Sequence, residues 1–193
     1  SDLPLRIYRF DYEGEHDTTY GASGYVAPST FTPASDLAGG VDSQGRFLFL
    51  DSTPQLDGEF QSQSIKITRF DTAGLVDATF GTAGVVEVKA SAFTGLTGKS
   101  LNASVVHVLE DDSLIIGGFI DGARDAHADR RWIVLKLNAD GSVDASFNGT
   151  GYVTIESNKR DRINAMHVAD DGTIYATVNR NDGMFDVVLF KIA

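Results

Sequence analysis

The chain has 193 residues, of which 42% are hydrophobic, and its 16 basic and 27 acidic side chains give a formal net charge of −11. This length suits one domain with a sizeable core, and the negative charge argues against binding to nucleic acid or to anionic membrane surfaces, which requires clustered Lys and Arg. The absence of cysteine excludes disulfides, a thiolate nucleophile and Cys-ligated zinc, and no apolar run approaches the roughly 18 residues of a membrane span.

Short strands and polar turns alternate along the chain, and no segment keeps a 3.6-residue apolar period for three turns, so helices are not expected. In chain order the sequence predicts a tail, a first strand, a small-residue loop leading to a weak strand, a polar insertion, two further strands and a closing strand, at residues 1–4, 5–10, 27–40, 51–63, 101–109, 163–168 and 185–192. The predicted fold class is all-β.

The clearest pattern is RWIVLKLNADGSVDASFNGTGYVTI at 131–155, which indicates a strand, a turn in which Gly141 supplies a positive φ, and a second strand. The chain carries this pattern three times, with earlier copies at 65–88 and 5–26. The copies share an aspartate expected to cap the turn, an aromatic residue expected to fill the space between repeats, and a glycine: Asp17, Asp77 and Asp144; Tyr20, Phe80 and Phe147; Gly24, Gly84 and Gly151.

A second piece, a polar turn followed by a short apolar strand, recurs at 41–50, 109–118 and 169–178. Together the two pieces give about four short antiparallel strands per unit, the content of one propeller blade, and such units must stack because one alone cannot bury its face. We expect a single β-propeller or half-propeller domain over 1–193, made of three units and one extra strand, at approximately 5–63, 64–130, 131–184 and 185–192.

The strings RFDTAGLVDATFGTAGVV and KLNADGSVDASFNGTGYV resemble the delta-60 repeat, a bacterial β-propeller repeat, and Asp-Asp-Gly-Thr-Ile at 170–174 fits its second element. The resemblance covers nearly the whole chain, although the first copy departs from it at Glu15, His16 and Tyr20. It implies a propeller fold and an extracytoplasmic location, either secreted, periplasmic or on the bacterial cell surface. It supplies no catalytic motif.

Three blades are too few to close a ring, which typically needs four to eight, and the open sheet edges would pair with another chain. We therefore expect a homodimer, another strand-sharing oligomer, or a piece of a longer propeller.

Two histidines, His107 and His167, occupy equivalent positions 60 residues apart, where the first unit has Gly40. They could line a channel or bind a ligand, although a half-buried position that accepts an imidazole is the simpler interpretation. A metal would need further ligands, and neither HxH nor HExxH is present. The loop at 119–130 offers a second candidate cluster, in which a histidine and acidic residues could act as base and orienting groups: Asp125, His127 and Asp129.

The turn at 138–144 has oxygen-bearing side chains at alternate positions, as calcium loops do, so a calcium site at Asn138, Asp140 and Asp144 is an alternative to plain turn capping. Otherwise no cofactor is expected.

Two functions fit these observations. The first is a binding or assembly scaffold that presents rim loops to a small molecule, a glycan or a partner. The alternative is a propeller hydrolase of lactonase or esterase type, although the sequence has no G-x-S-x-G motif.

Overall fold

The computed structural model describes residues 5–28, 37–57, 60–122, 130–156 and 162–179. Within these ranges the fold is all-β with antiparallel sheets, as the sequence predicts, and contains no α-helix. The elements are β1 (Ile7–Tyr8), β2 (Tyr25–Val26), β3 (Leu37–Val41), β4 (Phe47–Asp57), β5 (Phe60–Phe70), β6 (Val85–Val88), the 3-10 turn η1 (Ala90–Ala92), β7 (Lys99–Val108), β8 (Leu114–Gly122), β9 (Arg131–Leu137), η2 (Phe147–Gly149), β10 (Tyr152–Glu156), β11 (Arg162–Val168) and β12 (Ile174–Asn179).

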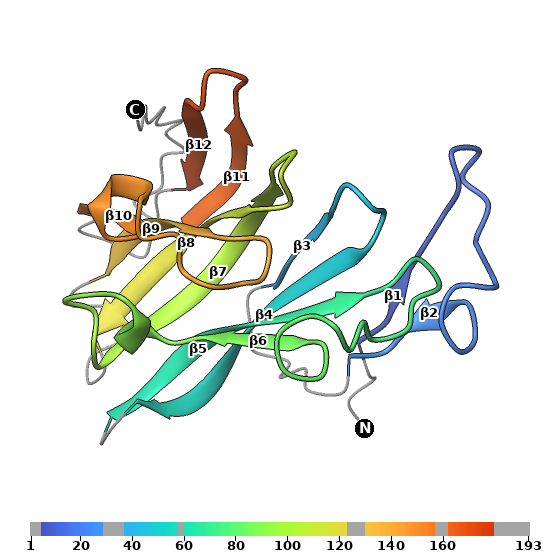
Figure 1. Cartoon of the computed structure of the whole chain (residues 1–193), viewed down its shortest axis with the longest axis horizontal. Helices are drawn as coiled ribbons and strands as arrows, with labels where there is room; N and C mark the ends of the chain where they lie inside the picture. The colour runs from blue at the N-terminus through green and yellow to red at the C-terminus, as the bar shows by residue number, and fades with distance from the viewer. Residues whose placement is uncertain (1–4, 29–36, 58–59, 123–129, 157–161, 180–193) are drawn as a thin grey trace.

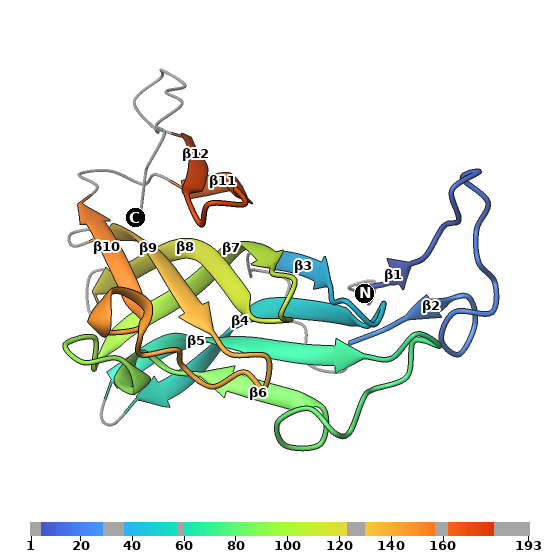
Figure 2. The same cartoon turned by 45° about the horizontal axis from the view of Figure 1, so that its top comes forward.

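Two four-stranded sheets form the middle of the molecule, in the orders β3-β4-β5-β6 and β7-β8-β9-β10. We call them the first and second full sheets. Two-stranded sheets flank them, the N-terminal pair β1–β2 and the C-terminal pair β11–β12. The two pairs lie at opposite ends of the stack (Figures 1 and 2).

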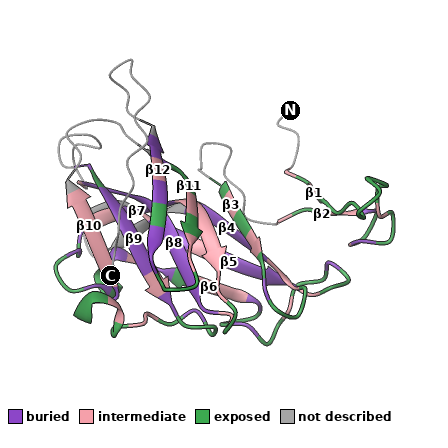
Figure 3. Ribbon diagram, turned by 90° about the horizontal axis from the view of Figure 1, so that it is seen from above, coloured by how far each residue is buried: buried purple, intermediate pink, exposed green. Residues whose placement is uncertain are grey.

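The sheets pack face to face through apolar side chains, with one cluster at each joint. The largest cluster lies between the two full sheets and includes Leu50, Ile67, Phe80, Leu101, Leu114 and Leu135. A second cluster joins the second full sheet to the C-terminal pair, and a third joins the N-terminal pair to the first full sheet. Figure 3 shows β8 buried along nearly its whole length. Each buried Leu, Ile or Phe contributes about 1.5–3 kcal/mol to folding.

The strand–turn–strand pattern folds in the same way in all three copies. In each, a basic residue at the end of one strand forms an ion pair with the shared aspartate eight positions later: Arg9 with Asp17, Arg69 with Asp77, and Lys136 with Asp144. The backbone N–H of that aspartate also donates to the carbonyl of the basic residue, at 2.9, 2.9 and 3.0 Å. The sequence repeat is therefore a structural repeat.

Gly84 shows why this repeat needs a glycine near its second strand. Its φ is +89°, and an added Cβ would lie 2.2 Å from Cγ1 of Val76, so both the backbone conformation and the lack of space exclude a side chain. Gly24 and Gly151 meet His16 and Val143 in the same way.

The prediction of a polar insertion between strands at 51–63 is wrong. β4 continues to Asp57 and β5 starts at Phe60, and the two strands pair without interruption from Phe47↔Phe70 to Asp57↔Phe60. Polar residues are accommodated in this ladder because the adjacent sheet covers it: Ser52 is buried, and its Oγ accepts a hydrogen bond of 3.2 Å from the backbone N–H of Ala103.

The boundaries of the sheets differ from the boundaries of the repeat units in the sequence. Each full sheet takes the second half of one unit and the first half of the next, since the full sheets span 37–88 and 99–156. No ring closes within the described residues, so the count of three units remains a prediction. The closing strand predicted at 185–192 lies outside the described residues.

Candidate functional site

Three hairpin turns, one from each of three successive sheets, lie along the same side of the stack (Figure 1), at 42–46, 109–113 and 169–173. Their backbones are alike: in each, the first N–H donates to the carbonyl of the fifth residue, at 3.0, 2.9 and 2.9 Å. The fourth residue has a positive φ, and it is Gly45, Asp112 and Gly172 in the three turns. The sequence therefore places one aspartate where its sister turns have glycine.

Asp112 links the first two turns. Its carboxylate accepts hydrogen bonds from the backbone N–H of Ser43 at 2.8 Å and from the Ser43 hydroxyl at 3.1 Å. Arg46 joins the link, because its guanidinium lies 3.9 Å from Asp112 and 2.7 Å from Asp42. The equivalent link between the second and third turns is missing, since Gly172 has no side chain and nothing lies within 4 Å of an added Cβ there.

A groove of about 630 Å³ occupies the place of this missing link. We call it the rim groove. It is lined by His107, Val108, Leu109, Glu110, Asp111, His167, Val168, Ala169, Asp170 and Gly172. The lining contains two imidazoles and three carboxylates, and neither Lys nor Arg. Its electrostatic character therefore favours a positively charged ligand.

His107 and His167, which the sequence singled out, meet in this groove. They come from the equivalent strands β7 and β11, and their ring centroids are 6.0 Å apart at an interplanar angle of 87°. Burial of the imidazole is the main cause that lowers the pKa of His107, and the nearby His167 lowers it further. His107 is therefore neutral at pH 7 and can accept as well as donate a hydrogen bond.

Gly40 breaks the histidine series for a steric reason. An added Cβ on this residue of β3 would lie 2.7 Å from Cγ2 of Val108 in the neighbouring strand β7. A histidine would not fit there, so the imidazole pair is confined to the joint between the second and third turns.

All three residues that carry these carboxylates, Glu110, Asp111 and Asp170, are exposed. Asp111 is used by its own turn, because it accepts from the Ser113 hydroxyl at 2.6 Å and the Ser113 N–H at 3.0 Å. These hydrogen bonds lower the pKa of Asp111, which keeps it ionised. Sequence reasoning did not place these acidic turn residues beside the histidines. The sequence signal that could have placed them there is that His107 lies only two residues before the turn that begins at Leu109.

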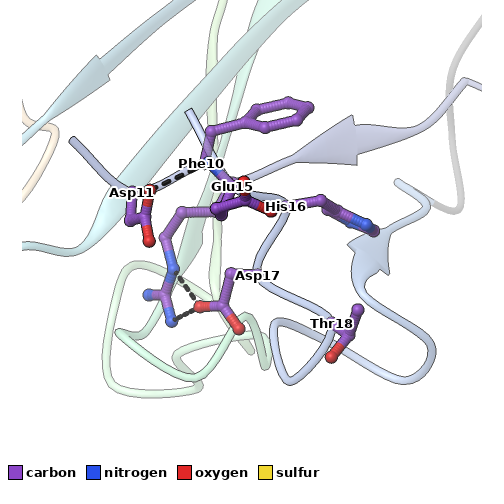
Figure 4. A pocket seen from close by; sticks show the side chains of 7 residues that line it. Phe10, Asp11, Glu15, His16, Asp17 and Thr18 are labelled. Atoms are coloured by element: carbon purple, nitrogen blue, oxygen red, sulfur yellow. Dashed lines mark hydrogen bonds and ion pairs between the residues drawn. The ribbon is translucent and has the colours of Figure 1, made fainter. Parts of the chain in front are cut away.

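A second cavity, of about 430 Å³, lies beside the N-terminal pair and is lined by Arg9, Phe10, Asp11, Glu15, His16, Asp17 and Thr18 (Figure 4). Dashed lines in Figure 4 end at Asp17, which accepts from the Arg9 guanidinium, and at Asp11, which accepts from the backbone N–H of Glu15. The other oxygen of Asp17 accepts from the Thr19 hydroxyl and N–H. Hydrogen bonds from Thr19 and Arg9 lower the pKa of Asp17. Arg9 and Asp17 are thus engaged in structural contacts, with each other, with Thr19 and with the carbonyl of Thr72 in the neighbouring turn.

In the predicted calcium turn, one carboxylate oxygen of Asp140 and one of Asp144 already accept hydrogen bonds from within the turn, and the Asn138 amide donates one. Asp140 accepts from the Ser142 N–H at 2.8 Å, Asp144 accepts from the Ser146 N–H at 3.0 Å, and the Nδ2 of Asn138 donates to Ser142. Within the described ranges, no group of three or more His, Cys, Asp or Glu side chains is arranged to hold a metal. Calcium at this turn stays a prediction, and it would have to displace these hydrogen bonds.

The remaining sequence candidates fall into two groups. Asp125, His127 and Asp129 lie outside the described residues. The shared aromatic residues pack at the joints, where Tyr20 and Phe80 are buried and Phe147 is half-buried. In the structure these aromatic residues are therefore packing residues.

A family model described as "Domain of unknown function (DUF5122) beta-propeller" matches residues 110–147, from the second hairpin turn to the start of η2. No curated protein matches the sequence. Among solved structures, an endo-arabinase from Bacteroides thetaiotaomicron is similar at 14% identity, with a TM-score of 0.43 over 89% of this chain and 62% of that chain. This chain therefore spans less than two thirds of that enzyme's length.

The description of the matched family agrees with the prediction that this stretch is a propeller repeat, and it does not name the delta-60 repeat. Among the helical turns that the structure describes, none is long and apolar enough to cross a membrane.

Proposed function

We propose that the chain is part of a β-propeller of the delta-60 repeat type that acts as a binding and assembly scaffold, with the rim groove as its ligand site. The observation that supports the site is the missing link between the second and third turns, which leaves two imidazoles and three carboxylates facing one groove. The ligand that this groove suits is a small molecule bearing a positive charge, such as an amine. The proposal includes an extracytoplasmic location.

The groove can be closed by design. In the first joint Ser43 donates to Asp112, and the equivalent positions in the second joint are Glu110 and Gly172. The double substitution Glu110→Ser and Gly172→Asp would rebuild the link there. Aspartate tolerates the positive φ, as Asp112 does at +63°.

The test is to titrate the protein with putrescine or choline and to monitor the imidazole proton signals by NMR. The signals of His107 and His167 are expected to move with putrescine in the parent chain, while those of His16 stay in place. The double variant should lose this response and keep its fold by circular dichroism. An identical response in parent and double variant, or none in either, would overturn the groove as the ligand site.

One observation favours the hydrolase alternative: the lowered pKa of His107 suits a general base at neutral pH. A screen of esters and lactones with the His107→Ala, His167→Ala and His127→Ala variants separates the two functions. Turnover that disappears in one folded variant would establish the enzyme, and equal background rates in all four proteins would leave the scaffold.

A further inference from the structure

The charge of the rim groove can change through its two imidazoles. The groove lining combines His107 and His167 with three carboxylates, those of Glu110, Asp111 and Asp170. Histidine is the side chain whose charge ordinarily changes between pH 5 and pH 8. With neutral imidazoles and ionised carboxylates the formal charge of the lining is −3, and one proton on each imidazole would bring it to −1. Protons and a cationic ligand therefore affect the charge of the groove in the same direction.

The imidazoles are surrounded by apolar, uncharged and acidic neighbours in the described part of the chain. The two rings lie 6.0 Å apart, and His107 is half-buried whereas His167 is exposed. The residue opposite His107 in β8 is Ile115, and the residue opposite His167 in β12 is Tyr175. The hairpin turns that follow β7 and β11 supply the carboxylates: Glu110, Asp111 and Asp170.

A nearby lysine is held outside the groove. Hydrogen bonds from Ser113 lower the pKa of Asp111, and the charge of Lys136 in β9 adds to this effect. The Nζ of Lys136, however, lies 3.0 Å from the carboxylate of Asp144, and Lys136 does not line the groove. The positive charges that can enter the described lining are therefore protons on the imidazoles and a bound ligand. Like charges at such a short separation disfavour each other.

We infer that protons and the cationic ligand compete for the rim groove, so that the ligand binds at neutral pH and is released when His107 and His167 become protonated in mild acid. This inference rests on the proposed function, because it concerns the regulation of the same site. It requires that the positive charge of the ligand lies beside the imidazoles, which line the same groove as the carboxylates.

The direction of the effect follows from the neutral state of the imidazole at high pH. Burial and, to a smaller extent, His167 lower the pKa of His107, so at pH 8 this ring is uncharged and offers a lone pair to an ammonium group. A proton that binds there as the pH falls removes the lone pair and adds a like charge. At one pH unit below the pKa of a competing group, the apparent dissociation constant of the ligand is about tenfold higher.

The test measures putrescine binding by isothermal titration calorimetry at about pH 5.5 and pH 8, at constant ionic strength because salt screens charge. Putrescine suits this comparison, since its amines, like that of lysine, stay protonated at both pH values. The proteins are the parent chain, the double variant His107→Asn and His167→Asn, and the matched control His16→Asn, whose histidine lines the other cavity (Figure 4). Circular dichroism at both pH values verifies the fold of each protein.

The parent chain and the His16→Asn control are expected to bind putrescine about tenfold more weakly at the lower pH. The double variant should show nearly the same dissociation constant at both pH values. Asp51, whose pKa burial raises to about 6, also titrates in this range, but it is present in all three proteins and cannot cause a difference between them. Equal affinities of the parent at the two pH values, or the same pH dependence in the double variant, would overturn the inference.

A second measurement needs no variant. NMR titration of the His107 proton signals gives its pKa with and without saturating putrescine, and competition requires that putrescine lowers this pKa, because the coupling between two ligands is reciprocal. An unchanged pKa would overturn the inference even if the double variant failed to fold or to bind. Equal putrescine affinity at both pH values would leave the rim groove as the ligand site and remove only its control by pH, whereas no binding at pH 8 would remove both.

Discussion

Asp51 is expected to make the folded state less stable at high pH. It lies in β4 with 1% of its surface exposed. Within the described residues its Oδ2 has no hydrogen-bond partner. Burial raises the pKa of Asp51 from 3.8 to about 6, against a smaller opposite effect of Lys66. A carboxyl whose pKa is higher in the folded chain binds more protons there, so stability falls as pH rises from about 3.8 to about 6.

The perturbation is Asp51→Asn, which keeps the shape and removes the titration. One pH unit of pKa difference corresponds to 1.36 kcal/mol, and the folded carboxyl titrates about one unit above pH 5. Between pH 5 and pH 8 the parent chain is therefore expected to lose about 1.4 kcal/mol that the variant does not lose. The cost of burying the new amide is the same at both pH values, so it cancels in this comparison.

The assay is urea denaturation of parent and variant at pH 5 and pH 8. Asp77→Asn serves as a control, because hydrogen bonds from Thr79 and the charge of Arg69 lower the pKa of Asp77. Its stabilising effect is complete above the unfolded pKa of 3.8, so the control should destabilise the chain equally at pH 5 and pH 8. A stability difference between D51N and the parent that is the same at both pH values would refute the reasoning.

Two further substitutions test the packing directly. Gly84→Ala is expected to cost more than the roughly 1–2 kcal/mol of a positive φ, because its Cβ would overlap Val76, whereas Gly45→Ala, with its nearest contact at 3.5 Å, should cost only that amount; equal shifts of the urea midpoint would contradict this. Asp121→Ala leaves the buried Arg130 guanidinium without the carboxylate that it binds at 2.7 and 2.9 Å, so calorimetry should show a loss of about 3–5 kcal/mol. A double variant with Asp121→Leu and Arg130→Met should recover most of that loss, and failure to do so would show that the ion pair is not its cause.

Much of the fold could be predicted because its causes are local. The strand at Arg131–Leu137 is visible as a short run of bulky apolar residues, which the structure buries on both faces, and the turn at Gly141 is visible in residues that tolerate a positive φ. The insertion predicted at 51–63 failed because its cause is not local. The buried Ser52 hydroxyl is tolerated in β4 because it accepts a hydrogen bond from the backbone N–H of Ala103, 51 residues away, and no periodicity of the segment itself contains that contact.

The candidate site could be predicted only in part for the same reason. Equivalent positions on repeated strands come together, so His107 and His167 could be paired from their spacing of 60 residues. The groove beside them depends on what is absent at Gly172. That absence has meaning only by comparison with the hydrogen bonds from Ser43 to Asp112, which join residues 69 positions apart.

The variation among the three copies is itself an argument for the rim groove. The three turns share one backbone conformation, whereas the residues at two rim positions differ between the joints in a correlated way. The first joint has Gly40 instead of histidine and has the linking carboxylate of Asp112. The second joint has His107 beside His167 and has Gly172 in place of the carboxylate. Packing requires a glycine at position 40, because an added Cβ would overlap the side chain of Val108. It does not require Gly172, since that position has room for a side chain and Asp112 adopts the same backbone conformation with one. The room at Gly172 is what leaves the rim groove open, and the putrescine titration tests the proposal that a ligand occupies it.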